Sequence, residues 1–168
     1  MPEPSGLDDA TNDLLSLAVA PSGETAATIA ALAHSPKLVG PFLGWAAALH
    51  FDGVLSARHH EVLALRVAHN CGSRYEWEEH TGWAEQAGLS ATEIAAVAAG
   101  PAGWPPTEGA LIRAADELHD RQDLTDSSLA ALIEVLDAPG AVEAVMVVGQ
   151  YTMLSMLASV IGPGEVAS

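Results

Sequence analysis

The side chains best suited to acid–base chemistry lie between residues 61 and 80. Glu76 and His80 are four residues apart, so on a helix they share one face and can touch. A carboxylate beside an imidazole favours the protonated ring and fixes its orientation, and such a pair can donate a proton near neutral pH. Glu61 lies on the helix expected just before this pair. The short break between the two helices predicts that Glu61 faces Glu76 and His80.

Taken alone, this spacing is weak evidence, because Glu and His four residues apart are also common on solvated helix faces. The supporting candidates are Cys71, Ser73, Tyr75, Trp77 and, farther along, His119. Ser73 or Tyr75 could hold a developing oxyanion, and His119 could line the pocket. The competing interpretations are a small buried thiol at Cys71, a core or pocket-wall residue at Trp77, and helix-end electrostatics at His119.

Histidines near Glu61 raise the question of a metal site. His59 and His60 are adjacent, so on a helix they point to different sides and cannot chelate one ion together. A site that also used Glu61 and His80 is conceivable. We predict no metal and no organic cofactor, and we expect Arg66 to be a structural ion-pair partner.

The segment 61–80, EVLALRVAHNCGSRYEWEEH, resembles the signature region of the carboxymuconolactone decarboxylase and alkylhydroperoxidase superfamily. The segments AADELHD, 114–120, and VGQYTMLSM, 148–156, also resemble members of it, so the resemblance covers roughly residues 25–161. It implies a small all-helical protein with an alkylhydroperoxidase-like fold that assembles as a trimer or hexamer.

The superfamily's peroxidase branch has two cysteines where this chain has Ser73 and Glu76. The decarboxylase branch has glutamate at the second cysteine position and keeps Glu-x-x-x-His, as Glu76 and His80 do here. Peroxide reduction with turnover through a disulfide requires an attacking and a resolving thiol, and this chain has a single cysteine. The residues therefore resemble the decarboxylase branch more closely.

This resemblance implies a cofactor-independent lyase or isomerase that acts on a small carbonyl acid or lactone. His80, held by Glu76, would return a proton to carbon, and Glu61 would act as base or proton shuttle. Two alternatives stay open: a thiol-dependent hydroperoxide reductase that uses Cys71, and a non-catalytic helical oligomer that binds a small ligand or a partner protein.

Composition and net charge limit the classes of molecule that this protein could bind. The chain has 168 residues, of which 49% are hydrophobic, and a formal net charge of −16. So acidic a chain repels phosphate backbones and anionic lipids, which predicts no nucleic-acid or membrane partner and leaves a small-molecule substrate. The single cysteine and the absence of a leader-like pattern in residues 1–13 favour the cytoplasm.

Weak strand signals and frequent helix start and stop signals predict an all-α single domain, 13–168, of about six to seven helices after a flexible acidic tail, 1–12. The uncharged run 144–161 has no basic flank, so we expect a buried central helix that another subunit partly covers. Helical segments are expected over 25–34, 37–51, 57–70, 75–87, 91–100, 107–121, 127–136 and 139–161.

Overall fold

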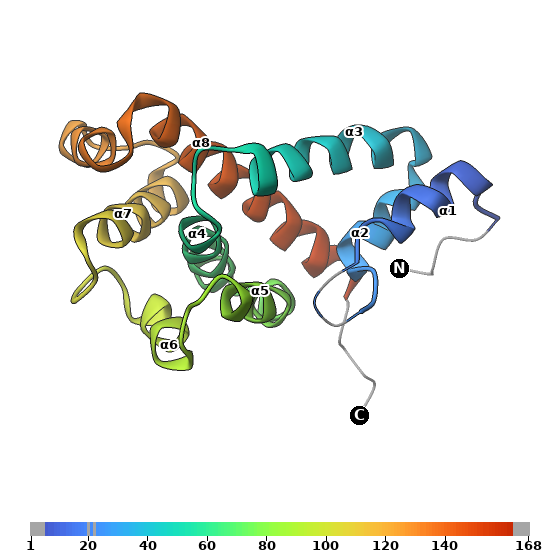
Figure 1. The fold of residues 1–168 in the computed structure, drawn as a ribbon, viewed down its shortest axis with the longest axis horizontal. Helices are drawn as coiled ribbons and strands as arrows, with labels where there is room; N and C mark the ends of the chain where they lie inside the picture. Colours follow the sequence, from blue (N-terminus) through green and yellow to red (C-terminus); the bar gives the residue numbers. More distant parts are fainter. Residues whose placement is uncertain (1–5, 20, 22, 163–168) are drawn as a thin grey trace.

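The computed structural model describes residues 6–19, 21 and 23–162, and within them the chain is all-α (Figure 1). Two short helical segments accompany the α-helices: the 3₁₀ turn η1 (Leu32–His34) and the π-helical turn η2 (Ala48–Asp52). The eight α-helices of this part of the chain, against the six to seven expected, are α1 (Asp9–Ser16), α2 (Ala27–Ala31), α3 (Pro36–Ala47), α4 (Ala57–Asn70), α5 (Arg74–Gln86), α6 (Ala91–Ala99), α7 (Pro106–Arg121) and α8 (Asp126–Ile161).

Helix α1 was not among the expected helical segments, whereas the last two of those segments form the single helix α8, and α1 corrects one expectation. Residues 9–12 were expected in a flexible tail, but they form the first half of α1. The side chain of Asp8 accepts a hydrogen bond from the Thr11 amide at 2.7 Å and so caps the helix. Residues 1–5 of the expected tail lie outside the described residues.

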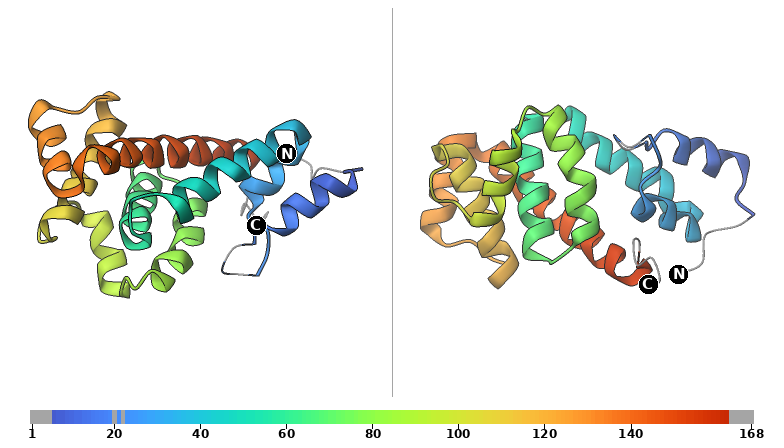
Figure 2. Two further views of the ribbon diagram at one scale, coloured as in Figure 1. Left: turned by 45° about the horizontal axis from the view of Figure 1, so that its top comes forward. Right: turned by 90° about the horizontal axis from the view of Figure 1, so that it is seen from below.

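Helix α4 lies at the centre of the molecule and packs against α5, α6, α7 and α8 (Figures 1 and 2). Every residue from 60 to 65 is buried, so α4 has no solvated face over this stretch. The side chain of Ser56 caps its first turn by accepting from the His59 amide, as expected of a serine at this position. A polar side chain in the middle of α4 therefore faces other helices rather than water.

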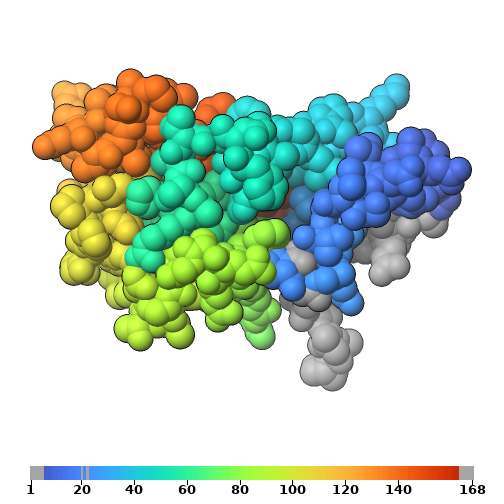
Figure 3. All heavy atoms as spheres, in the orientation of Figure 1, coloured from blue at the N-terminus to red at the C-terminus, as the bar shows by residue number. Residues whose placement is uncertain are grey.

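Helix α8 runs along the molecule, with α6 and α7 near one end and α1–α3 near the other (Figures 1 and 2). In the space-filling view, the yellow and orange atoms of α7 and the start of α8 lie at one end and the blue atoms of α1 at the other (Figure 3). Two separate helices were expected here, and the backbone does break between them. Asp137 has φ 57° and ψ −178°, outside the helical region, and Pro139 follows in the first turn of the continuing helix. The expected boundary is thus present as a kink inside one long helix.

By length and composition, α8 could cross a membrane, but its most apolar stretch is 44% buried inside the molecule. The buried residues pack on α4 and α7 in the larger core cluster. Its other face exposes apolar side chains, most of all at Val142, Met156 and Val160. One face of α8 therefore packs in the core, as in other core helices. No element among the described residues covers its outer face.

Candidate functional site

A buried carboxylate and imidazole form the centre of the site. His80 Nδ1 lies 2.8 Å from Glu61 Oε2, and the Nε2 atom of the same ring lies 3.9 Å from Glu76 Oε2. Glu61 is 1% exposed, Glu76 2% and His80 8%. The three residues expected to converge from the sequence therefore do so, with the imidazole between two carboxylates.

Local sequence explains why these groups meet. Residues 70–73 stop α4 and start α5 within a few residues, and Gly72 adopts the φ of +63° that this turn requires. Ser73 then caps α5 by accepting a hydrogen bond from the Glu76 amide at 3.4 Å. The i,i+4 spacing places Glu76 and His80 on the face of α5 that packs on α4. Glu61 lies on α4 and faces them.

Burial and charge oppose each other at His80. Burial lowers the pKa of the imidazole, but the attraction and hydrogen bond of Glu61, with the charges of Glu76 and Glu79, outweigh it. The net effect raises the pKa of His80 above its ordinary value. Burial also raises the pKa of the Glu76 carboxyl, and the nearby imidazole only partly offsets that shift. An imidazolium beside a carboxylate with raised pKa is a pair that can exchange a proton.

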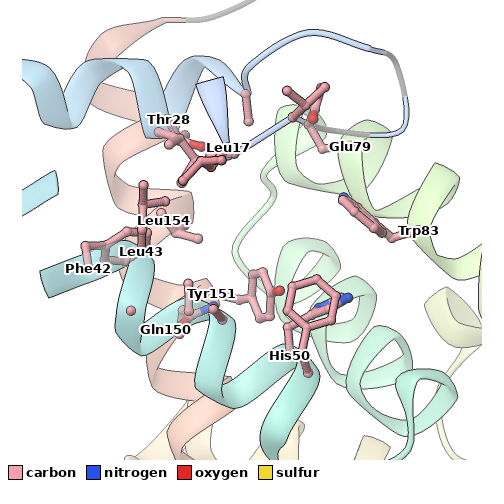
Figure 4. A pocket seen from close by; sticks show the side chains of 18 of the residues that line it. Leu17, Thr28, Phe42, Leu43, His50, Glu79, Trp83, Gln150, Tyr151 and Leu154 are labelled. Carbon is pink, nitrogen blue, oxygen red and sulfur yellow. The ribbon is translucent and has the colours of Figure 1, made fainter. Parts of the chain in front are cut away.

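Glu61 and His80, here called the dyad, border through His80 a cavity of about 510 Å³ that is bounded by α1, α2, α3, η2, α5 and α8. Figure 4 shows His50, Tyr151 and Gln150 along one side of it, with Glu79 and Leu17 across from them. Glu61 itself does not line the cavity but lies behind His80. The lining residues that carry polar groups are Thr28, His50, Glu76, Glu79, His80, Trp83, Gln150 and Tyr151.

The structure adds residues that sequence reasoning missed. His50 Nδ1 approaches Glu61 Oε1 to 3.7 Å, so this carboxylate lies between two imidazoles. Tyr151 hydrogen-bonds His60 at 2.8 Å through its hydroxyl and packs edge-on against the His80 ring at 4.4 Å. Polar Gln150 and Tyr151 within an apolar run were the one available signal, since both needed partners at a pocket or an interface. The sequence contained no such signal for His50, because its orientation depends on the π-helical turn η2.

The residues that could hold a cation differ from those considered in the sequence. One ligand atom from each of His50, His60 and Glu61 lies within 4.8 Å of the others. His59 is not among them, in agreement with the divergence of adjacent side chains on a helix. The same carboxylate already contacts both His80 and His50, so a cation there would compete with these two rings.

Comparison with known proteins agrees with this geometry. A family model described as Carboxymuconolactone decarboxylase family matches residues 36–117. The chain contains a carboxymuconolactone decarboxylase family domain. A search of curated proteins found no match. The matched residues extend from the start of α3 into α7 and include Glu61, Glu76 and His80, whereas Gln150 and Tyr151 on α8 lie outside them.

The supporting residues expected beside the dyad do not line the cavity. Ser73 is occupied as the cap of α5, and the Tyr75 hydroxyl accepts a hydrogen bond from the Ala27 amide at 2.6 Å. Burial raises the pKa of Tyr75 to about 12. Trp77 packs against the smaller core cluster. None of the three lines the cavity, so an oxyanion role for Ser73 or Tyr75 finds no support in the geometry.

Cys71 and His119 form a separate pair at the far end of α4. The Cys71 sulfur lies 3.9 Å from His119 Nδ1, and neither residue lines the cavity. Burial raises the pKa of the Cys71 thiol, with smaller opposing effects from Ser155 and Thr152. A thiol with a raised pKa is a poor nucleophile at neutral pH.

Arg66 is a structural ion-pair partner, as expected. Its guanidinium binds both carboxylate oxygens of Asp116, at 2.6 and 3.0 Å, and donates to the carbonyls of Val97 and Ala98. These contacts join α4, α6 and α7. No donor of Arg66 is directed at the cavity, whose described lining does not include it.

Proposed function

We propose that this protein is a cofactor-independent lyase or isomerase that moves a proton at a carbon next to a carbonyl group of a small carbonyl acid or lactone. The observation that carries the proposal is the 2.8 Å contact between His80 and the buried Glu61 at the wall of a cavity. Membership of the carboxymuconolactone decarboxylase family agrees with such chemistry but leaves the substrate open.

The proton transfer can be followed atom by atom. Glu61 accepts the Nδ1 proton of His80 in a hydrogen bond, which stabilises the imidazolium and directs its Nε2–H toward Glu76 and the cavity. In an isomerisation, Glu76 takes a proton from the carbon beside the carbonyl, and the electron pair delocalises as a dienolate. Nε2 of His80 then returns a proton to the far carbon of the conjugated system, and Glu76 passes its proton back to His80.

The same parts serve a decarboxylation. The bond to the leaving carboxylate breaks, carbon dioxide departs, and the electron pair again forms a dienolate. His80 supplies the proton that ends on carbon, and solvent restores it to the ring through Glu76. Both reactions require His80 to transfer a proton to a carbon atom of the substrate, so the first test measures that transfer.

Hydroperoxide reduction at Cys71 is the less supported alternative. Burial raises the pKa of this thiol, it lies outside the cavity, and the sequence has no second cysteine. A thiol peroxidase requires a thiolate that peroxide can reach. The observations on Cys71 therefore favour proton transfer at the dyad.

The test follows proton transfer to carbon directly. A β,γ-unsaturated lactone is incubated with the protein in D₂O, and NMR records the conjugated isomer with deuterium at the γ-carbon. We expect His80→Gln and Glu61→Gln to lower this rate by about a hundredfold or more, as loss of a general acid does. Glu78→Gln, on the exposed face of α5, is the matched control and should keep the full rate. Equal rates in wild type and His80→Gln would overturn the proposal.

A further inference from the structure

We infer that the cavity accepts an uncharged carbonyl compound with an apolar body and one hydroxyl group, rather than a compound with several carboxylates. The inference rests on the proposed function for the reacting carbonyl and adds the class of molecule that carries it. If it holds, the substrate has no carboxylate to lose, so isomerisation rather than decarboxylation is the reaction of this site.

The described cavity lining has more acidic groups than cations, and its one cation is the imidazolium of His80. Its described lining contains neither lysine nor arginine but includes the carboxyl groups of Glu76 and Glu79. The imidazolium of His80 is already paired with Glu61, and burial lowers the pKa of His50, which keeps that ring neutral. A carboxylate on the ligand would thus lose water and meet negative charge without gaining a cation.

No arginine is among the described residues that line the cavity, and four arginines pair with carboxylates elsewhere. Arg58 binds Glu93 and Glu108, and Arg66 binds Asp116. Arg74 pairs with Glu78 within α5, and Arg121 pairs with Glu117 within α7. Recognition of a compound with several carboxylates normally uses such guanidinium groups.

Apolar side chains supply most of the remaining wall. Leu17, Phe42, Leu43, Phe51 and Leu154 line the cavity together with alanines and glycines of α3. A space of about 510 Å³ lies within the range of pockets that hold small organic ligands and is larger than a compact acid requires. The ligand therefore gains its affinity from an apolar body.

Two buried oxygen atoms define the polar end of that ligand. Gln150 Oε1 and Glu76 Oε1 are buried acceptors without a hydrogen-bond partner, on side chains that line the cavity. Gln150 is 6% exposed and Glu76 2%. A buried acceptor without a donor is costly, and a small rotation of either side chain toward the cavity would let a hydroxyl group on the ligand donate to its oxygen.

The first experiment measures binding without turnover, using two probes of equal carbon number. γ-Decalactone is uncharged, and decanoate carries one carboxylate. Quenching of tryptophan fluorescence reports binding because Trp83 lines the cavity, and Trp83→Phe should remove the signal. We expect the lactone to bind at least about tenfold more tightly, because a carboxylate in the cavity is repelled by the glutamates. Equal or tighter binding of decanoate would overturn the inference.

Variants locate the cause of that preference. Glu79→Gln should improve decanoate binding several-fold and leave lactone binding unchanged, whereas Glu78→Gln, one residue away and exposed, should change neither. Gln150→Leu should weaken a lactone that carries a hydroxyl group several-fold and leave γ-decalactone unchanged. A Glu79→Gln protein that still binds decanoate as weakly, or a Gln150→Leu protein that still binds both lactones alike, would contradict this assignment.

The two proposals fail separately. Loss of proton exchange with intact preference for the lactone would remove the proposed function and leave the binding class. Proton exchange that still depends on His80, together with tighter binding of decanoate, would remove the binding class alone.

Discussion

A carboxylate that is 1% exposed lies between two imidazoles at the centre of this protein. Burial alone would lower the pKa of His80 and keep its ring neutral, yet the attraction of Glu61 favours the protonated ring. His60 shows the contrasting case, since burial outweighs the attraction of Glu61 and lowers its pKa to about 4. The 2.8 Å hydrogen bond to Glu61, closer than the 3.7 Å approach of His50, thus distinguishes His80 as the histidine of this cluster whose protonated form is favoured.

The pKa of His80 should depend on Glu61 in a measurable way. In Glu61→Gln the largest raising influences disappear while burial remains, so the pKa of His80 should fall below its ordinary value. The carbon and nitrogen shifts of the ring, followed by NMR across the pH range, measure this. Wild-type activity that needs the imidazolium should likewise decline as pH rises through the raised pKa of His80.

The matched control for that titration is Glu78→Gln, which removes an exposed carboxylate from the same helix. It should leave the His80 titration where it is. An unchanged His80 pKa in Glu61→Gln would mean that the contact between the two residues does not hold the proton.

Among the elements, the kink in α8 has a strained backbone, and a single substitution should relieve that strain. Asp137 combines φ 57° with ψ −178°, a region that only glycine occupies readily. We expect Asp137→Gly to raise the free energy of unfolding by about 1 kcal/mol, since relief of strain exceeds the entropic cost of glycine. Denaturant unfolding followed by circular dichroism measures the change.

Asp126→Gly supplies the contrast on the same helix. Asp126 has an ordinary place in the first turn of α8, where an acidic residue interacts favourably with the helix dipole. Glycine there should lower stability by roughly 0.5–1 kcal/mol. If Asp137→Gly destabilised the protein as Asp126→Gly does, the kink would not be strained.

For the whole molecule, the outer face of α8 indicates self-association. Val142, Met146, Met153, Met156 and Val160 are spaced by three or four residues, or by sums of these, and all are exposed, so they form one apolar stripe. Exposed apolar surface of this kind is typical of subunit interfaces. We therefore propose a homo-oligomer, and the family resemblance implies a trimer or hexamer.

Sedimentation velocity tests this proposal. The double variant Met153→Lys and Met156→Lys should sediment as a smaller species than wild type, because two buried charges would disfavour the interface. Glu134→Lys, at an exposed polar position of the same helix, should sediment as wild type does. A monomeric wild type would refute the assembly and leave the stripe unexplained.

The sequence by itself determined the features that depend on neighbours along the chain. Ser56 and the Ser90–Glu93 capping box start helices where they were predicted, since each satisfies the first amides of its own helix. The meeting of Glu76 and His80 followed from helical spacing in the same way. With the family resemblance, these signals were enough to predict the all-α fold and the dyad.

Only the tertiary structure decided what depends on distant segments. His50 reaches Glu61 because a π-helical turn follows α3, and Tyr151 joins His60 from another helix. Ser73 and Tyr75, close to the dyad in sequence, turned out to serve a helix cap and a contact with Ala27. Packing brings residues from separate helices to one cavity, and helical periodicity within a segment contains no information about which neighbour its outer face will meet.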